Sequence, residues 1–158
     1  MEDGRLVPFQ DGYPDDVACC FGCGRLNEHG HRIKSFWEGE EAVCRFVPEP
    51  YHTAVPGYVY GGLIASLIDC HGTGTAAAAA CRAEGGEAGA GSDFRFVTAS
   101  LHVEYKRPTP LGPPIELRAR VSELKGRKVT VTEEVIVNGE LCATGVVVAV
   151  RMPEHMRS

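Results

Sequence analysis

The chain has 158 residues and a formal net charge of −5, with acidic and basic residues scattered along it. This length is most simply one domain with its own core. The acidic balance argues against a nucleic-acid-binding protein, which usually carries a basic excess. The start, MEDGRLVPFQDGYPDD, lacks the basic-then-apolar order of a secretory signal. The seven cysteines form no disulfide-scaffold layout, so we expect reduced thiols and a cytoplasmic location.

The first third of the chain reads as an irregular arm, a loop and a strand pair. Glycines punctuate the loop, and a short acidic turn separates the two strands. Three prolines then indicate a loop or a short helix. In chain order these segments are Met1–Val17, Cys19–Gly30, His31–Trp37, Ala42–Val47 and Pro48–Gly57.

The stretch from Gly57 to Cys81 is long, apolar and rich in small residues, and Asp69 is its single acidic group. Its length raises the question of a membrane span. Asp69, His71, the repeated glycines and the lack of a second such stretch favour a buried helix instead, from Gly61 to about Arg82. A carboxylate in these surroundings is costly unless it is paired, hydrogen-bonded or used.

The second half of the chain alternates with a period of two, which indicates strands. A flexible connection, residues 84–93, precedes them, and Asn138-Gly139 predicts a tight hairpin. The order of two strands, one buried helix and four antiparallel strands predicts an α+β fold whose sheet curls around the helix. We expect an arm at 1–18, the domain at 19–151 and a tail at 152–158. The four predicted strands are Thr98–Lys106, Ile115–Val121, Val129–Val137 and Leu141–Val150.

The segments now described carry a family resemblance. Gly61-Gly62, six residues and then Asp69 resembles the motif of the hotdog-fold thioesterases, in the branch of the phenylacetate-degradation and hydroxybenzoyl-CoA enzymes, although Tyr60 stands where the family usually has His. Residues 98–108, 125–129 and 20–24 are similar to further family blocks, so the resemblance covers roughly residues 19–150. It implies a hotdog fold, an antiparallel sheet of five to six strands wrapped around one long central helix.

The resemblance implies an acyl-CoA thioesterase, which hydrolyses a thioester to a carboxylic acid and free coenzyme A without a metal or other cofactor. The backbone N–H of Gly61 would hold the oxyanion, and Asp69 would act as general base or as nucleophile. Tyr60 would donate a phenolic hydrogen bond in place of the missing imidazole. The structural alternative is that Asp69 is merely satisfied by Thr73, four residues on, or by a partner chain.

The resemblance also implies a homodimer with a shared site, and it leaves a dimer of dimers open. A hydroxyl from the strand after the helix would cross the interface, and Thr98 is the matching position. The remaining substrate-binding candidates surround the expected site or lie at turns where cations could meet coenzyme A phosphates, although charges at turns often only solvate a surface. They are His52, Gly62, Thr73, Ser100, Lys106, Arg107, Arg127 and Lys128.

The pair Cys20 and Cys23 raises the question of zinc, because Cys19, His29 and His31 are near in sequence. A second Cys-x-x-Cys pair is missing, so we expect no metal. The other cysteines stand in apolar contexts and read as core thiols: Cys44, Cys70, Cys81 and Cys142.

Two further functions remain open on the same fold. Tyr60 in place of His keeps a non-catalytic acyl-CoA-binding protein in view, since fold does not guarantee activity. A hotdog dehydratase would need a well-placed histidine, and His71 lies two positions from Asp69, on a different helix face. Neither alternative calls for a membrane or a nucleic acid as partner.

Overall fold

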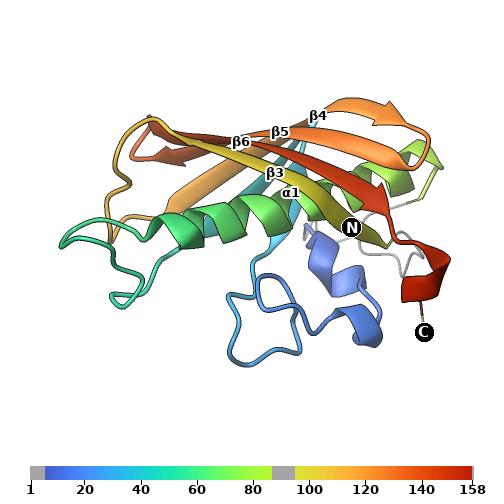
Figure 1. Ribbon diagram of the computed structural model, residues 1–158, viewed down its shortest axis with the longest axis horizontal. Coiled ribbons are helices and arrows are strands. Elements are labelled where there is room, and N and C mark those ends of the chain that lie inside the picture. Colours follow the sequence, from blue (N-terminus) through green and yellow to red (C-terminus); the bar gives the residue numbers. More distant parts are fainter. Residues whose placement is uncertain (1–5, 87–94, 158) are drawn as a thin grey trace, which may run out of the picture.

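One antiparallel sheet of six strands packs against one long helix (Figure 1). The computed structural model describes residues 6–86 and 95–157. Short 3-10 turns, η1 (Phe9–Gly12), η2 (Asp15–Val17) and η3 (Glu154–Met156), lie near the two ends of the chain. The helix and strands are β1 (Ser35–Glu38), β2 (Glu41–Phe46), α1 (Gly61–Ala83), β3 (Phe96–Tyr105), β4 (Ile115–Lys125), β5 (Lys128–Val137) and β6 (Glu140–Arg151).

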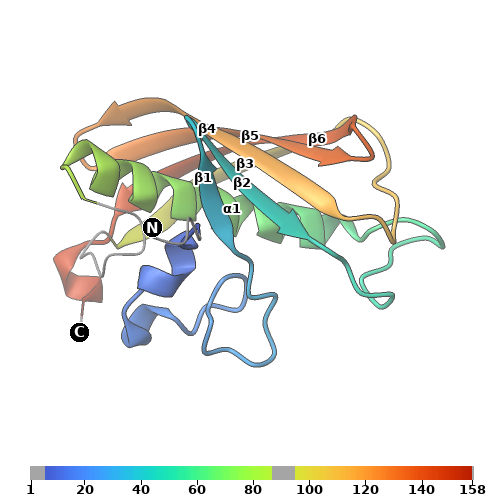
Figure 2. The same cartoon turned by 180° about the vertical axis from the view of Figure 1, so that it is seen from behind.

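The strands lie in the order β1-β2-β4-β5-β6-β3, and each neighbouring pair is antiparallel. Both ribbon views show α1 running along one face of the curved sheet, with the N-terminal segment on the side of the helix away from the sheet (Figures 1 and 2). This is the arrangement expected of a hotdog fold. The topology leaves β1 and β3 as the two end strands.

The helix confirms the boundaries that its composition predicts, 61–82 against Gly61–Ala83. Ile64, Leu67 and Ile68 are fully buried, and the alanine run that follows packs closely because its side chains are small. A Cβ at Gly145 on β6 would lie 2.4 Å from Ile68 Cγ2, so glycine there lets helix and sheet approach. No helix within residues 6–86 or 95–157 is long and apolar enough to cross a membrane.

Several strand boundaries differ from the predicted ones. Residues 31–34 precede β1 without joining the sheet, and β4 continues to Lys125, past the predicted end at Val121. The segment between β2 and α1 contains turns and no helix. The Asn138-Gly139 hairpin is confirmed: both residues have positive φ, 52° and 77°, as a tight two-residue turn requires. The predicted connection at 84–93 falls largely outside the described residues.

The N-terminal arm contributes to the core. Phe9 is 3% exposed and Gln10 is fully buried. Gln10 Nε2 donates to Ser35 Oγ at 3.0 Å, and its Oε1 accepts from the Ser35 N–H at 2.8 Å. Part of the predicted arm therefore packs against β1. The domain boundary at residue 18 stays a prediction.

Candidate functional site

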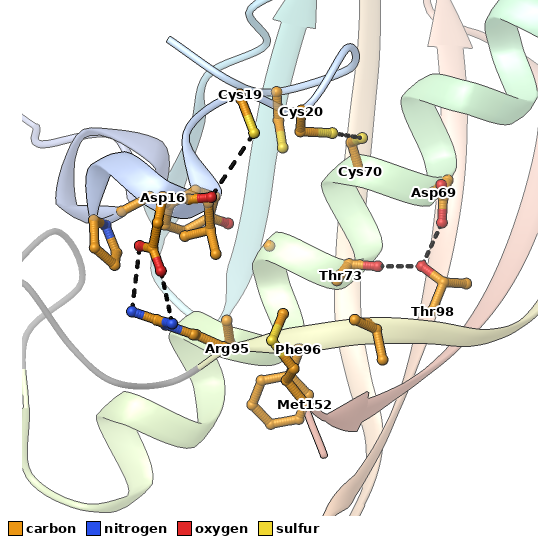
Figure 3. A pocket seen from close by; sticks show the side chains of 17 residues that line it. Asp16, Cys19, Cys20, Asp69, Cys70, Thr73, Arg95, Phe96, Thr98 and Met152 are labelled. Carbon is orange, nitrogen blue, oxygen red and sulfur yellow. Dashed lines mark hydrogen bonds and ion pairs between the residues drawn. The ribbon is translucent and has the colours of Figure 1, made fainter. Parts of the chain in front are cut away.

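A cavity of about 410 Å³ opens between the N-terminal loop, the middle of α1 and the start of β3. Figure 3 shows polar groups from α1 and β3 on one side of it, a group of sulfur atoms above, and an apolar end around Phe96 and Met152. The cavity thus combines an ionisable side chain with an apolar wall, which is the usual composition of a small-molecule site.

Asp69 lies on this cavity and is held by a chain of hydroxyl groups. Thr98 Oγ1, on β3, donates to Asp69 Oδ1 at 2.5 Å, and the two threonine hydroxyls are 2.7 Å apart (Figure 3). Because the Thr98 proton goes to the carboxylate, Thr73 must donate to Thr98. Thr73 therefore supports Asp69 through Thr98 rather than by the direct contact that its spacing suggests. The chain fixes the orientation of the carboxylate.

Glu133 lies behind the site, on β5, where it faces α1. It is 3% exposed, and neither of its carboxyl oxygens has a hydrogen-bond partner among the described residues. A Cβ at Gly72 would lie 2.5 Å from Glu133 Oε2, so the helix glycine makes room for this carboxyl. Burial, and then the charge of Asp69, raise the pKa of Glu133 well above its usual value. Burial therefore favours the neutral, protonated form of Glu133.

Three thiols from two segments meet at the upper wall of the cavity. The sulfur atoms of Cys20, Cys23 and Cys70 all lie within 4.8 Å of one another. Hydrogen bonds from Cys23 and Cys70 lower the pKa of Cys20 to about 2, and the same bond to Cys20, with burial, raises the pKa of Cys23 to about 12. Cys70 is half-buried here and is not the core thiol that we expected, whereas Cys44, Cys81 and Cys142 are buried as predicted.

An ion pair closes the apolar end. Arg95 and Asp16 both line the cavity, with Arg95 Nη1 2.9 Å from Asp16 Oδ2. Phe96 lies on the wall beside this ion pair and makes this end of the cavity apolar. Nothing in the sequence pointed to Arg95, because an isolated arginine before a strand reads as a surface charge.

Comparison with known proteins agrees with this architecture. Residues 56–144, more than half of the chain, match the thioesterase superfamily. The chain belongs to that family. The resemblance to the hotdog-fold thioesterases, and the fold that it implied, are confirmed.

Three similar proteins illustrate the relationship. Acyl-coenzyme A thioesterase THEM4 from Xenopus laevis is 40% identical over 87 residues, which make up 55% of this chain and 33% of THEM4. This chain thus spans about a third of the length of that relative. A thioesterase superfamily protein from Shewanella loihica PV-4 is 48% identical, with a TM-score of 0.65 over 80% of this chain and 96% of that one. The protein smu.793 from Streptococcus mutans, solved with acetyl CoA, is 14% identical with a TM-score of 0.62 over 81% and 96%, and shares the fold.

In this member of the thioesterase superfamily, the glycine pair lies away from the cavity. Eight positions separate Gly61 from Asp69, which corresponds to about 12 Å along a helix. No side chain caps the start of α1. The Tyr105 hydroxyl donates to Gly61 O at 2.7 Å, and the exposed Tyr60 ring lies over Gly62. Within one chain, Gly61 and Asp69 therefore cannot act on the same carbonyl group.

Other predicted substrate-binding residues lie outside the cavity wall. His52 Nδ1 accepts from the Glu49 N–H at 2.9 Å, and its ring packs edge-on against His31. Ser100 is exposed on β3 beyond a bulge that follows Thr98. Thr98 contacts its own chain's Asp69, which differs from the expected crossing to a second subunit.

The four predicted phosphate-binding cations occupy two separate places. Lys106 pairs with Glu104 and Arg107 with Glu140, each at 2.9 Å. Arg127 Nη2 donates to the backbone oxygens of Arg151 and Met152 at 3.4 Å, and Lys128 is exposed at the start of β5. Their role in binding stays a prediction.

His71 is fully buried, and both of its ring nitrogens are engaged. Nε2 donates to Ala42 O at 3.1 Å, so Nδ1 accepts from the Ser35 hydroxyl at 2.8 Å. Burial lowers the pKa of His71 to about 4. Because this imidazole is neutral and both of its nitrogens are hydrogen-bonded, it cannot serve the acid–base chemistry of a dehydratase.

Proposed function

We propose that this chain is an acyl-CoA thioesterase that converts an acyl-CoA and water to a carboxylic acid and free coenzyme A. The observation that carries the proposal is the carboxyl group of Asp69, held by Thr98 on the wall of an otherwise largely apolar cavity, in a member of the thioesterase superfamily. The name of the THEM4 relatives and the acetyl CoA bound to smu.793 support the substrate class.

Asp69 has two possible roles in this reaction. As a general base it takes a proton from water, and the resulting hydroxide attacks the thioester carbonyl carbon. As a nucleophile it forms a mixed anhydride, which water then hydrolyses. The hydroxyl chain from Thr73 through Thr98 holds Asp69 Oδ1 in either case, so the other carboxylate oxygen is the reactive one.

The oxyanion that forms during attack needs donors that one chain does not bring to Asp69. We propose that a second copy supplies its Gly61 N–H, and that the protein is a homodimer with a shared site. Support comes from β3: it lies at the end of the sheet, it carries Thr98, and Leu101 and Tyr105 on it are 40% and 54% exposed. Pairing of two such strands would cover this edge. An oxyanion donor of this kind contributes about 3–4 kcal/mol.

The apolar end of the cavity suits the acyl group, with Phe96 and Met152 as walls. The coenzyme A moiety would extend out of the cavity, and Lys106, Arg107, Arg127 and Lys128 remain the candidates for its phosphates. We further propose a cytoplasmic location, because the seven cysteines of the sequence form no disulfide-scaffold layout.

The decisive experiment measures thiol release from aromatic, short-chain and long-chain acyl-CoAs by the wild type and by Asp69→Asn. Because a general base contributes about 10²–10⁴-fold, we expect kcat to fall at least a hundredfold in this variant. Asp11→Asn, on the exposed surface of η1, is the matched control. Full activity in Asp69→Asn would refute the role of the carboxylate.

The same screen also tests the alternative function, which is that of an acyl-CoA-binding protein without turnover. Tyr60 at the start of α1 is the feature that keeps this alternative open. Binding of an acyl-CoA by calorimetry, with no thiol release by the wild type across the panel, would establish it. Sedimentation at several dilutions tests the dimer: an active monomer would contradict the shared site.

A further inference from the structure

The three clustered thiols have the spacing of a metal site. Cys20 Sγ and Cys70 Sγ are 3.8 Å apart, and Cys23 Sγ completes the group within 4.8 Å (Figure 3). A zinc ion bound tetrahedrally at about 2.3 Å from each sulfur places those sulfurs about 3.8 Å from one another. A disulfide would require a sulfur–sulfur distance of about 2.0 Å. The observed separation is that of a thiol hydrogen bond, which is also the distance between two ligands of one zinc ion, and it is too long for a disulfide.

The loop that carries Cys20 and Cys23 is built for this approach. The Gly24 N–H donates to Cys20 O at 2.8 Å, which closes the turn between the two cysteines. A Cβ at Gly22 would lie 2.3 Å from Cys70 Sγ, so only glycine lets the turn lie against the helix there.

The third thiol comes from the helix and not from the neighbours of the pair in sequence. His31 packs its ring against Phe21 and Phe46, and Cys19 Sγ donates toward Asp16 O. Cys70 instead lies one residue after Asp69 and lines the cavity together with Cys20 and Cys23. A site with three protein ligands keeps one position open, and here that position faces the cavity beside Asp69.

We propose that Cys20, Cys23 and Cys70 bind one zinc ion as three thiolates, with the fourth position open to the cavity. Zn²⁺ binds all three as thiolates, so each thiol that is still protonated gives its proton to solvent, and the zinc–trithiolate group has a net charge of −1, to which water adds as the fourth ligand. The ion ties the N-terminal loop to the middle of α1, and so fixes the upper wall of the cavity. This inference stands apart from the proposed hydrolysis, since the hydrolysis needs no metal.

The test uses the full chain, purified without a histidine tag and kept reduced with a phosphine. Elemental analysis after equilibration with zinc and desalting should give about one zinc per chain. X-ray absorption should show three sulfurs at about 2.3 Å and one lighter ligand. Less than a tenth of an equivalent of zinc, or a first shell without sulfur, would overturn the proposal, as would a wild type that takes up no zinc and forms a Cys20–Cys70 disulfide in air.

Variants assign the ligands independently of activity. Cys70→Ser should lower the retained zinc at least tenfold, whereas Cys19→Ser, in the adjacent loop position, should retain it. Replacement of zinc by cobalt adds a second reading, because a thiolate-to-cobalt absorption band should appear in the wild type and in Cys19→Ser. Zinc retained in full by a folded Cys70→Ser protein would remove the helix thiol from the site and refute the three-ligand arrangement.

Discussion

Glu133 offers a direct test of the electrostatics behind the site. Its carboxyl group is buried between β5 and α1 without a hydrogen-bond partner among the described residues, and its pKa is raised well above the ordinary value of 4.5. In the unfolded chain the group ionises near that ordinary value. Between the two pKa values the folded protein therefore holds one proton more than the unfolded chain, and its stability falls as pH rises.

Glu133→Gln removes this titration and keeps the size of the side chain. The free energy of unfolding of the variant, relative to wild type, should increase by about 1.4 kcal/mol for each pH unit within this window. From about pH 5 to about pH 7 the relative gain reaches about 2.7 kcal/mol, as long as the folded pKa lies above that range. Any pH-independent cost of burying the amide cancels in this comparison.

Urea unfolding at fixed protein concentration and ionic strength, repeated across this pH range, measures the effect. Glu134→Gln, on the exposed face of the same strand, controls for the loss of one carboxylate. A difference between Glu133→Gln and wild type that stays constant from pH 5 to pH 7 would refute the reasoning, since it would show that Glu133 is ionised in the folded protein.

Further substitutions, with matched controls for two of them, test three other contacts. Thr98→Val removes the hydroxyl that holds Asp69; because a hydrogen bond to a charged group contributes about 1.5–3 kcal/mol, kcat should fall about 10–100-fold, whereas Thr98→Ser should stay near wild type. Gly72→Ala places a Cβ 2.5 Å from Glu133 Oε2 and 2.6 Å from Val147 Cγ2, so denaturant unfolding should show a loss of about 1–3 kcal/mol. Gly62→Ala meets only the exposed Tyr60 ring and should leave stability within about 1 kcal/mol of wild type. Gln10→Leu leaves the Ser35 N–H without its acceptor and should lower the free energy of unfolding by about 2–4 kcal/mol. A change below about 0.5 kcal/mol would show that the arm is not part of the fold.

The fold could be predicted from the sequence to within a few residues. The buried helix could be predicted because its long run of small apolar residues does not alternate with a period of two, as a strand would. The last hairpin could be predicted because Asn138-Gly139 favours a tight two-residue turn. The start of β1 was less readable: residues 31–34 have strand-like composition, but Arg32 adopts a positive φ of 50° that takes this segment out of the sheet.

Only part of the candidate site could be predicted from the sequence. Asp69 could be found, because a lone carboxylate in an apolar helix is a local signal, whereas Thr98 came from the family resemblance alone. The strand pattern also placed Glu133 among inward-facing valines, a signal that was present but was not interpreted as a buried acid. Cys70 could not be found, since its neighbours in the helix are apolar and its partners lie 50 residues away in the chain.

The separation of Gly61 from Asp69 could have been predicted. Eight helical positions correspond to about 12 Å whatever the tertiary structure, so the two groups of the motif could never act on one carbonyl within a chain. Only the arrangement of the end strand suggests how a second copy would bring them together.

Thr98 belongs to the strand at the margin of the sheet, which is bonded within this chain to β6. A strand at the edge of a sheet frays more readily than a central one. The hydrogen bond that holds the Asp69 carboxylate therefore depends on what stabilises this edge. If a second copy does so, turnover per molecule should decline on dilution, and the cellular abundance of the protein would itself set how active each molecule is.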